Sequence, residues 1–263
     1  MNRRDYHGLI CEVSPLIDAA HAFPTRLGGV STGALASLNL GVSQGDDPAS
    51  VAENYARLGR AVGFSPARCS LTHQVHGNTV RRITAADAAG LDAPRPDCDA
   101  LITDLPGAAL VIFTADCIPV LLYDPVTGAV GAAHCGWRGT ALGLAEKTVH
   151  AMEDTFGSRA ADLRCAIGPG ISRCCFETDA DVPDAVRTAL GAAAEPYLRP
   201  AGAKWYVDLK GINRHFLERA GVAQIDVSDG CTACSPELFW SHRRMGAQRG
   251  SQGAVIVCGR VGV

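Results

Sequence analysis

The sequence lacks the features that mark several large classes of protein. No apolar run among its 263 residues is long enough to span a bilayer. The net charge is only -3, and nothing suggests the clustered basic face that a nucleic-acid footprint needs. Acidic residues interrupt the first segment before any sustained apolar stretch, so we see no signal peptide. We therefore expect a cytoplasmic protein with neither membrane nor nucleic-acid partners.

Internal repeats, low-complexity tracts and linker-like stretches are also absent. With 47% hydrophobic residues, a chain of this length can bury a substantial core. We expect one domain over residues 1–263. Strand and helix patterns intermix without a regular βαβ rhythm, so the predicted fold class is α/β with a mixed sheet rather than a parallel doubly wound sheet.

Apolar periodicity and turn residues predict the main elements. A helix is predicted over Ser50–Ala61, with Ser50 and Glu53 as a capping box and Gly63 at its end. Further helices are predicted after Gly139, over Pro183–Ala193 and from Asp208 to Gly221. The predicted strands are Leu9–Leu16, Ser70–Val75, Thr79–Ile83, Leu110–Phe113, Ile118–Tyr123, Leu163–Ile167, Val222–Val227 and Ala254–Cys258.

Metal-ligating residue types lie at the ends of these predicted strands. Cys117 separates two apolar runs, and His134 lies at the end of a third run of small and apolar residues. His76 lies upstream in a turn that contains Gly. Zinc binds Cys sulfur and His nitrogen, and a catalytic zinc keeps a fourth position open. The hypothesis is that these three residues converge on one metal ion. A buried thiol and two hydrogen-bonded core histidines are the alternative at this point.

Neighbouring residues extend this hypothesis. Asp97 and Asp99 share a face if their segment is a strand, so one of them could orient a metal-bound histidine, and two solvated loop carboxylates are the equal alternative. Cys135 would point to the face opposite His134, which excludes it as a ligand. His73 is interpreted as a structural or surface histidine.

The chain has 11 cysteines, an odd number that does not suggest a disulfide scaffold. Cys231 and Cys234 form a CxxC pair, but only His242 stands close in sequence, so no structural zinc site is expected there. Cys174 and Cys175 are interpreted as core-filling residues.

Three arginines are candidates for binding an anion. Arg26 lies beside a Gly pair, Arg138 precedes a predicted helix N-terminus, and Arg243 belongs to a short basic cluster. Solvation at the surface is the alternative for Arg26 and for Arg243.

Motifs along nearly the whole chain together resemble one family. They are PTRLGGVS, SLNLG, GDDPASVAEN, QVHG, DCDALIT, TADCIPVLLYDP, AAHCGWRGT, AIGPGISRCCFE, DLKGINRHFL, CTAC and FWSHRRMGAQRG. The family is the multicopper polyphenol oxidase, or laccase-domain, family, later described as purine nucleoside phosphorylases and including peptidoglycan-editing factors. The resemblance implies a four-layer α/β/β/α sandwich with a metal, zinc or alternatively copper, on His76, Cys117 and His134. It also implies phosphorolysis of adenosine, inosine, guanosine and methylthioadenosine, together with adenosine deamination.

Several functions are compatible with these residues. In a zinc enzyme, Arg26, Arg138 and Arg243 would hold phosphate and Asp116 is a candidate proton donor to the departing base. In a cysteine hydrolase, or a peptidoglycan-editing factor working the same way, Cys117 would be the nucleophile and His134 its base. A non-enzymatic metal-binding protein is a third interpretation. Copper-dependent oxidation fits poorly, because the chain has 8 His and no His-x-His pair.

Overall fold

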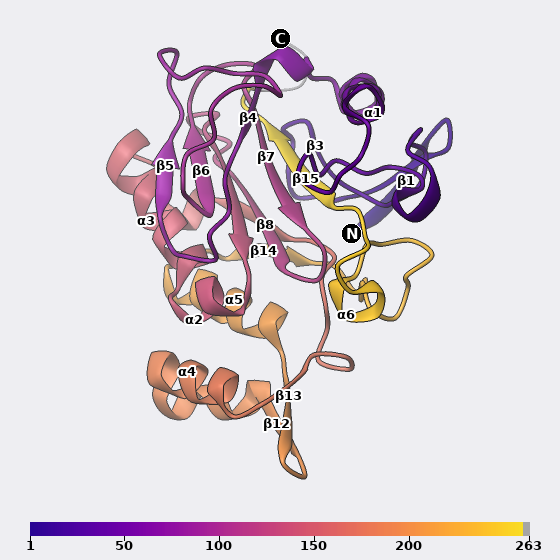
Figure 1. The fold of residues 1–263 in the computed structure, drawn as a ribbon. Helices are drawn as coiled ribbons and strands as arrows, with labels where there is room; N and C mark the ends of the chain where they lie inside the picture. The colour runs from indigo at the N-terminus through magenta and orange to yellow at the C-terminus, as the bar shows by residue number, and fades with distance from the viewer. Residues whose placement is uncertain (260–263) are drawn as a thin grey trace.

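The computed structural model describes residues 1–259 and is built on two six-stranded sheets (Figure 1). The first sheet has the order β1-β2-β3-β15-β7-β4 and the second β14-β10-β8-β9-β6-β5. The first comprises β1 Asn2–Tyr6, β2 Leu9–Val13, β3 His21–Pro24, β4 Cys69–Leu71, β7 Ala109–Thr114 and β15 Gln252–Val257. The second comprises β5 Val80–Arg82, β6 Ala100–Thr103, β8 Ile118–Tyr123, β9 Val130–Cys135, β10 Arg164–Ile167 and β14 Gln224–Val227.

Both sheets mix strand directions. β4 runs parallel to β7, and β14 runs parallel to β10, whereas the pairs of β7 with β15 and of β8 with β9 are antiparallel. The predicted mixed α/β class is therefore confirmed.

Helices cover the outer face of each sheet. The longer helices are α1 Pro48–Val62, α3 Leu144–Phe156, α4 Asp181–Leu190 and α5 Leu209–Arg219, and α2 Trp137–Ala141 and α6 His242–Met245 are short. Tyr55 of α1 packs with Val111 of the first sheet, whereas Met152 and Phe216 pack with Leu122 of the second. A separate apolar cluster, including Leu110 and Leu121, lies between the two sheets. These layers form the α/β/β/α sandwich that the resemblance implied.

Strand alternation decides which residues reach each layer. In β9, Ala132 faces the inter-sheet core, whereas Ala133 and Cys135 pack toward the helices. His134 shares the side of Ala132. Cys135 therefore lies on the face opposite His134, as its adjacent position predicted.

Helix α1 begins earlier than its sequence pattern predicted. The carboxylate of Asp47 accepts hydrogen bonds from the N–H groups of Ala49 and Ser50, and Pro48 occupies the first turn. The predicted capping box is wrong, because Glu53 is engaged by Arg57 instead, with a 2.9 Å contact. Gly63 closes the helix in the left-handed conformation at φ 93°, as predicted.

A small arm projects from the sandwich (Figure 1). It contains α4 and a three-stranded sheet of β11 Glu177–Thr178, β12 Leu198–Ala201 and β13 Lys204–Val207. The strands of this sheet were not predicted, because several of their side chains are exposed and no run of apolar residues marks them.

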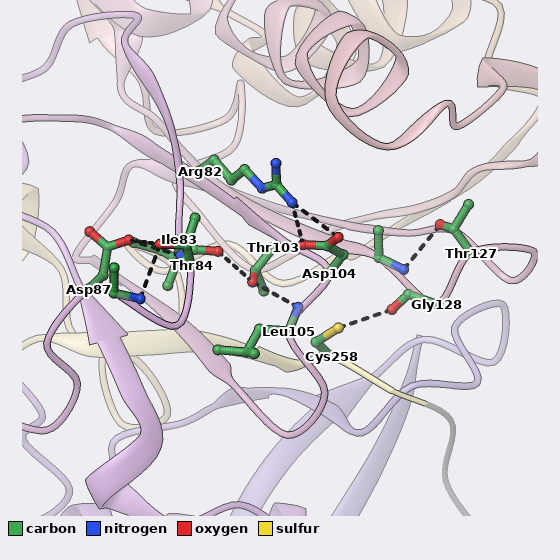
Figure 2. A network of polar contacts seen from close by, with 12 residues as sticks. Arg82, Ile83, Thr84, Asp87, Thr103, Asp104, Leu105, Thr127, Gly128 and Cys258 are labelled. Carbon is green, nitrogen blue, oxygen red and sulfur yellow. Dashed lines mark hydrogen bonds and ion pairs between the residues drawn. The ribbon is translucent and has the colours of Figure 1, made fainter.

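Hydrogen bonds fasten loops to the sheets away from the arm, as Figure 2 shows. The hydroxyl of Thr103 in β6 donates to the carbonyl of Ile83 and accepts from the N–H of Leu105. The thiol of Cys258 lies 3.3 Å from the carbonyl oxygen of Gly128, which ties the C-terminal strand to the β8–β9 turn. Within residues 1–259, no helix combines the length and the apolar character needed to cross a bilayer.

Candidate metal centre

Three ligand-type side chains meet at one end of the sandwich. His76 lies in the turn between β4 and β5, Cys117 follows β7, and His134 lies in β9. Antiparallel pairing sets Ile118 of β8 opposite Cys135 of β9, which brings Cys117 alongside His134. One donor atom from each of the three residues lies within 4.8 Å of the others. The two imidazole rings meet edge to face, with centroids 4.9 Å apart.

Asp99 organises two of these residues and is itself fully buried. One carboxylate oxygen lies 2.8 Å from Nδ1 of His134, which leaves the other ring nitrogen for a ligand bond. The same carboxylate accepts the N–H groups of His76 at 3.1 Å and Gly77 at 2.7 Å. These bonds hold His76 at φ 58°, a conformation that is uncommon for residues other than glycine. The sequence left Asp97 and Asp99 as equal candidates, and the structure gives the contact with His134 to Asp99.

Electrostatics couple the members of the centre. Burial lowers the pKa of His134, but negative charge on Cys117 and the hydrogen bond with Asp99 outweigh burial and raise it to about 9. Desolvation and the nearby charge of His134 lower the pKa of His76. Burial raises the pKa of Asp99, yet its bonds from His134 and Gly77 bring the net value below the ordinary one. The centre thus favours an ionised carboxylate beside a cation.

Asp116 is a supporting residue rather than a free carboxylate. One of its oxygens accepts the hydroxyl of Thr232 at 2.6 Å and the other accepts the N–H of Arg243 at 2.7 Å. These bonds accompany a backbone φ of 95°, directly before Cys117. The carboxylate does not line the cavity described below, so its geometry fits a positioning role better than the proton-donor role suggested by the sequence.

Gly136 leaves the space beside two of the candidate ligands, His76 and Cys117, clear of side-chain atoms. A Cβ atom at this position would lie 2.7 Å from Nδ1 of His76 and 3.2 Å from Sγ of Cys117. The backbone of Gly136, at φ -63° and ψ 169°, is open to any residue, so conformation alone does not require glycine there. Two imidazoles and one thiolate suit zinc and leave a fourth position open. The residues present therefore fit the metal that the resemblance implied.

The three side chains border a cavity of about 320 Å³. Arg95, Phe113 and Arg249 also line it. The buried hydroxyls of Thr72 and Thr114 and Nε of Arg249 have no hydrogen-bond partner among the described residues. All three residues line the cavity, although these particular atoms are themselves buried.

The structure separates the three arginines that the sequence grouped. Arg26 donates to the carbonyls of Ala36 and Pro236 and stacks on Trp240, and Arg243 donates to two carbonyls at the base of the arm. Both guanidinium groups thus fasten backbone. Arg138 is exposed, and its charge contributes to lowering the pKa of His76.

Arg249 is the cavity arginine that sequence reasoning missed. It lies in the loop before β15 and donates to the carbonyl of Gly250 at 2.9 Å and to the hydroxyl of Ser251 at 3.2 Å. Burial lowers its pKa, and the nearby carboxylate of Asp116 opposes that effect. The sequence signals for it are the Gly that follows it, ahead of the last strand, and its place in the motif FWSHRRMGAQRG.

Comparison with known proteins gives a consistent result. A family model described as multi-copper polyphenol oxidoreductase laccase matches residues 20–259. A purine nucleoside phosphorylase of Deinococcus radiodurans is 42% identical, covering 92% of this chain and 90% of that protein. Purine nucleoside phosphorylase YlmD of Geobacillus stearothermophilus is 37% identical, covering 94% and 92%.

Solved structures agree with the sequence relatives. The crystal structure of YlmD from Geobacillus stearothermophilus superposes with a TM-score of 0.90 at 35% identity and covers 97% of both chains. That of the hypothetical protein YfiH from Bacillus licheniformis has a TM-score of 0.91 at 32% identity, covering 98% and 99%. With its sandwich fold and its His–Cys–His centre at the end of the sheets, the chain belongs to the multi-copper polyphenol oxidoreductase laccase family.

Proposed function

We propose that the chain is a zinc-dependent purine nucleoside phosphorylase. Its substrates would be adenosine, inosine, guanosine and methylthioadenosine, and it would also deaminate adenosine. The observation that carries the proposal is the set of His76, Cys117 and His134 at the border of a cavity of about 320 Å³. The relatives named purine nucleoside phosphorylase support the substrate class.

Each residue of the centre has a distinct task in this proposal. His76, Cys117 and His134 would hold zinc, which when bound supplies a Lewis acid and an acidified water. Asp99 would fix the ring of His134 and keep its metal-facing nitrogen unprotonated. Asp116 would position Cys117 through its bonds to Thr232 and Arg243.

Phosphate would be held by positive charge at the cavity. In phosphorolysis, phosphate attacks the anomeric carbon as the bond to the base breaks through an oxocarbenium-like state. Arg249 lies in the cavity wall with an unpartnered Nε, and Arg138 stands beside His76. We assign phosphate binding to these two residues. Arg26 and Arg243, whose guanidinium groups are bound to carbonyls, would instead shape the loops around the site.

The test combines turnover with metal content. Purified protein would be incubated with adenosine with and without phosphate, and free base, ribose phosphate and deaminated product would be separated by chromatography. We expect phosphate-dependent release of the base, loss of turnover after chelation and recovery with zinc. Cys117→Ala should lose about one zinc per chain relative to wild type. Full turnover in metal-depleted protein would contradict the proposal.

A specific contact favours cysteine hydrolase as the second candidate. Cys117, His134 and Asp99 form a nucleophile–base–carboxylate series, and Asp99 lies 2.8 Å from the imidazole. This series gives His76 no chemical task. His76→Ala therefore separates the two functions: it should abolish metal-dependent phosphorolysis, whereas a cysteine hydrolase should survive it and should resist chelation while remaining sensitive to alkylation.

A further inference from the structure

A second group of cysteines lies at the base of the arm. Cys174 and Cys175 stand just before β11, and Cys231 and Cys234 lie in the loop after β14. Their four Sγ atoms all lie within 4.8 Å of one another. Cys174 is exposed rather than core-filling, and in space the CxxC pair has a second pair of ligand-type residues beside it that its sequence neighbourhood did not show.

The spacing of the sulfur atoms suits one tetrahedral ion. Sγ of Cys174 lies 3.7 Å from that of Cys175, 3.7 Å from that of Cys231 and 3.5 Å from that of Cys234. Cys175 and Cys234 are 3.3 Å apart. A zinc ion with four bonds of about 2.3 Å holds its sulfurs about 3.8 Å apart, whereas a disulfide would bring two of them to about 2.05 Å. All four residues are free thiols in the structure.

The backbone beside Cys231 favours negative charge on its sulfur. The N–H of Ser172 points at Sγ of Cys231, with a nitrogen–sulfur distance of 3.4 Å. Two cationic side chains bind the loops that carry the thiols. The buried ammonium of Lys210 donates to the carbonyls of Ser228 and Gly230 at 2.8 Å each, and Arg243 donates to the carbonyl of Cys175 at 3.0 Å. An ion with four thiolate ligands carries a net negative charge, which these cations would offset.

We propose that these four cysteines bind a single zinc ion as a closed structural site, separate from the His76–Cys117–His134 centre. Four protein ligands leave no open position, which is the arrangement of a structural zinc rather than a catalytic one. Tetrahedral thiolate ligation selects zinc or iron among common metals, and a set of sulfurs this compact accommodates one ion.

The site would brace the base of the arm against the sandwich. The apolar contacts there are few, with Ile171, Cys231 and Ala233 as the buried members of the local cluster. Backbone bonds already align the two segments, since the N–H of Thr232 donates to the carbonyl of Gly170 at 3.2 Å. A shared ion adds a strong crosslink between segments that a small cluster holds weakly.

The four-cysteine group is also linked to the first centre through Thr232. Thr232 lies between Cys231 and Cys234, and its hydroxyl holds the carboxylate of Asp116 next to Cys117. Loss of the ion should loosen that hydroxyl without removing any ligand of the first centre. We therefore expect altered binding of substrate with the first metal retained.

The first experiment counts metal in the purified full-length protein by mass spectrometry of the elements. Variants are Cys231→Ser with Cys234→Ser, Cys117→Ala, and Cys258→Ala as a matched buried-thiol control outside both groups. We expect about two zinc ions per chain in wild type and in the control, and about one in each of the other variants. Loss of all zinc in Cys117→Ala would overturn the second site, as would iron in place of zinc. Failure of the proposed nucleoside chemistry would leave this count unchanged.

The second experiment needs no variant. Native protein is alkylated before and after chelation, and the labelled cysteines are mapped by peptide mass spectrometry. We expect Cys174 and Cys234, both exposed, to be protected until the chelator is added. Rapid labelling without the chelator, or a disulfide among the four residues, would overturn the proposal.

Discussion

Two groups of cysteine-containing ligands differ in almost every physical respect. The first, at His76, Cys117 and His134, has three donors of two types and borders a cavity. Asp99 beneath it is fully buried and bonds both to a ligand ring and to the turn that carries another ligand. The second consists of four sulfurs at the base of the arm; Cys174 and Cys234 are exposed, Cys175 is half-buried and Cys231 is buried.

The difference shows how the number of ligands and their surroundings decide what a bound metal ion could do at each place in the chain. An open set of three donors fixed by a buried carboxylate can admit substrate, whereas a closed set of four can only join segments. Backbone conformation points the same way. His76 and Asp116, at the first centre, have positive φ values of 58° and 95°. Among residues 1–259, none of the four cysteines has a positive φ.

The largest expected contrast is between removing a thiol from each group. Cys117→Ala should reduce phosphorolysis by about 10³-fold or more, because several kcal/mol of transition-state stabilisation depend on the metal. Cys231→Ser with Cys234→Ser should keep kcat within about tenfold while lowering the thermal midpoint. Paired kinetic and melting measurements check both. Equal loss of turnover in the two variants would abolish the distinction between the centres.

Asp99→Asn tests whether the first centre depends on its buried carboxylate. The amide keeps the volume but weakens the bond to His134 and the bonds from the 75–77 turn. Zinc affinity should fall by about 10- to 100-fold, measured by competition with a chromophoric chelator. Asp97→Asn is the matched control, because the Asp97 carboxylate contacts the exposed His73. Indistinguishable affinities for the two variants would argue against the role of Asp99.

Gly136→Ala probes the space at the same centre with one methyl group. The new Cβ would lie 2.7 Å from Nδ1 of His76, so the ring must shift to admit it. Since the backbone of Gly136 suits alanine, we expect a small change in melting temperature and about a tenfold loss of zinc affinity, equal to about 1.4 kcal/mol. Zinc bound at the four-cysteine group should be unaffected. Wild-type affinity at the first centre would show that this space is not needed.

Much of the sandwich could be predicted from local sequence. The apolar run of Ile118–Tyr123 and the glycine after α1 are visible within a few residues, and both have the predicted conformation. His76, Cys117 and His134 were expected to meet because each lies at the end of a short apolar run. Their meeting follows from pairing between neighbouring strands, which a sequence pattern can suggest.

Contacts between distant loops could not be predicted in the same way. The signal for the four-cysteine group was present, since Leu163–Ile167 and Val222–Val227 were both predicted as strands and each precedes a cysteine pair. Only the parallel pairing of β10 with β14 brings those two pairs together. Arg26 shows the opposite error: an arginine near a Gly pair was a candidate for binding an anion, but the fold supplies carbonyls from residues 36 and 236.

The smallest expected effect comes from a comparison of two His–Asp pairs, each with 2.8 Å between Nδ1 of the ring and a carboxylate oxygen. The His134–Asp99 pair is buried, at 3% and 0% side-chain exposure, whereas the His73–Asp97 pair is 69% and 74% exposed. In metal-free protein, despite burial of the ring, negative charge on Cys117 and the bond with Asp99 raise the pKa of His134 from 6.5 to about 9. The protonated ring therefore stabilises the fold fully below pH 6.5, and this contribution is lost as pH rises through about 9. Chemical denaturation of chelated protein should therefore show the free energy of unfolding falling by about 1–3 kcal/mol across that window.

Two variants serve as controls. His134→Asn should remove the slope of stability against pH, and His73→Asn should keep it, because solvent screens an exposed pair. A slope that persists in His134→Asn would assign the titration to another group.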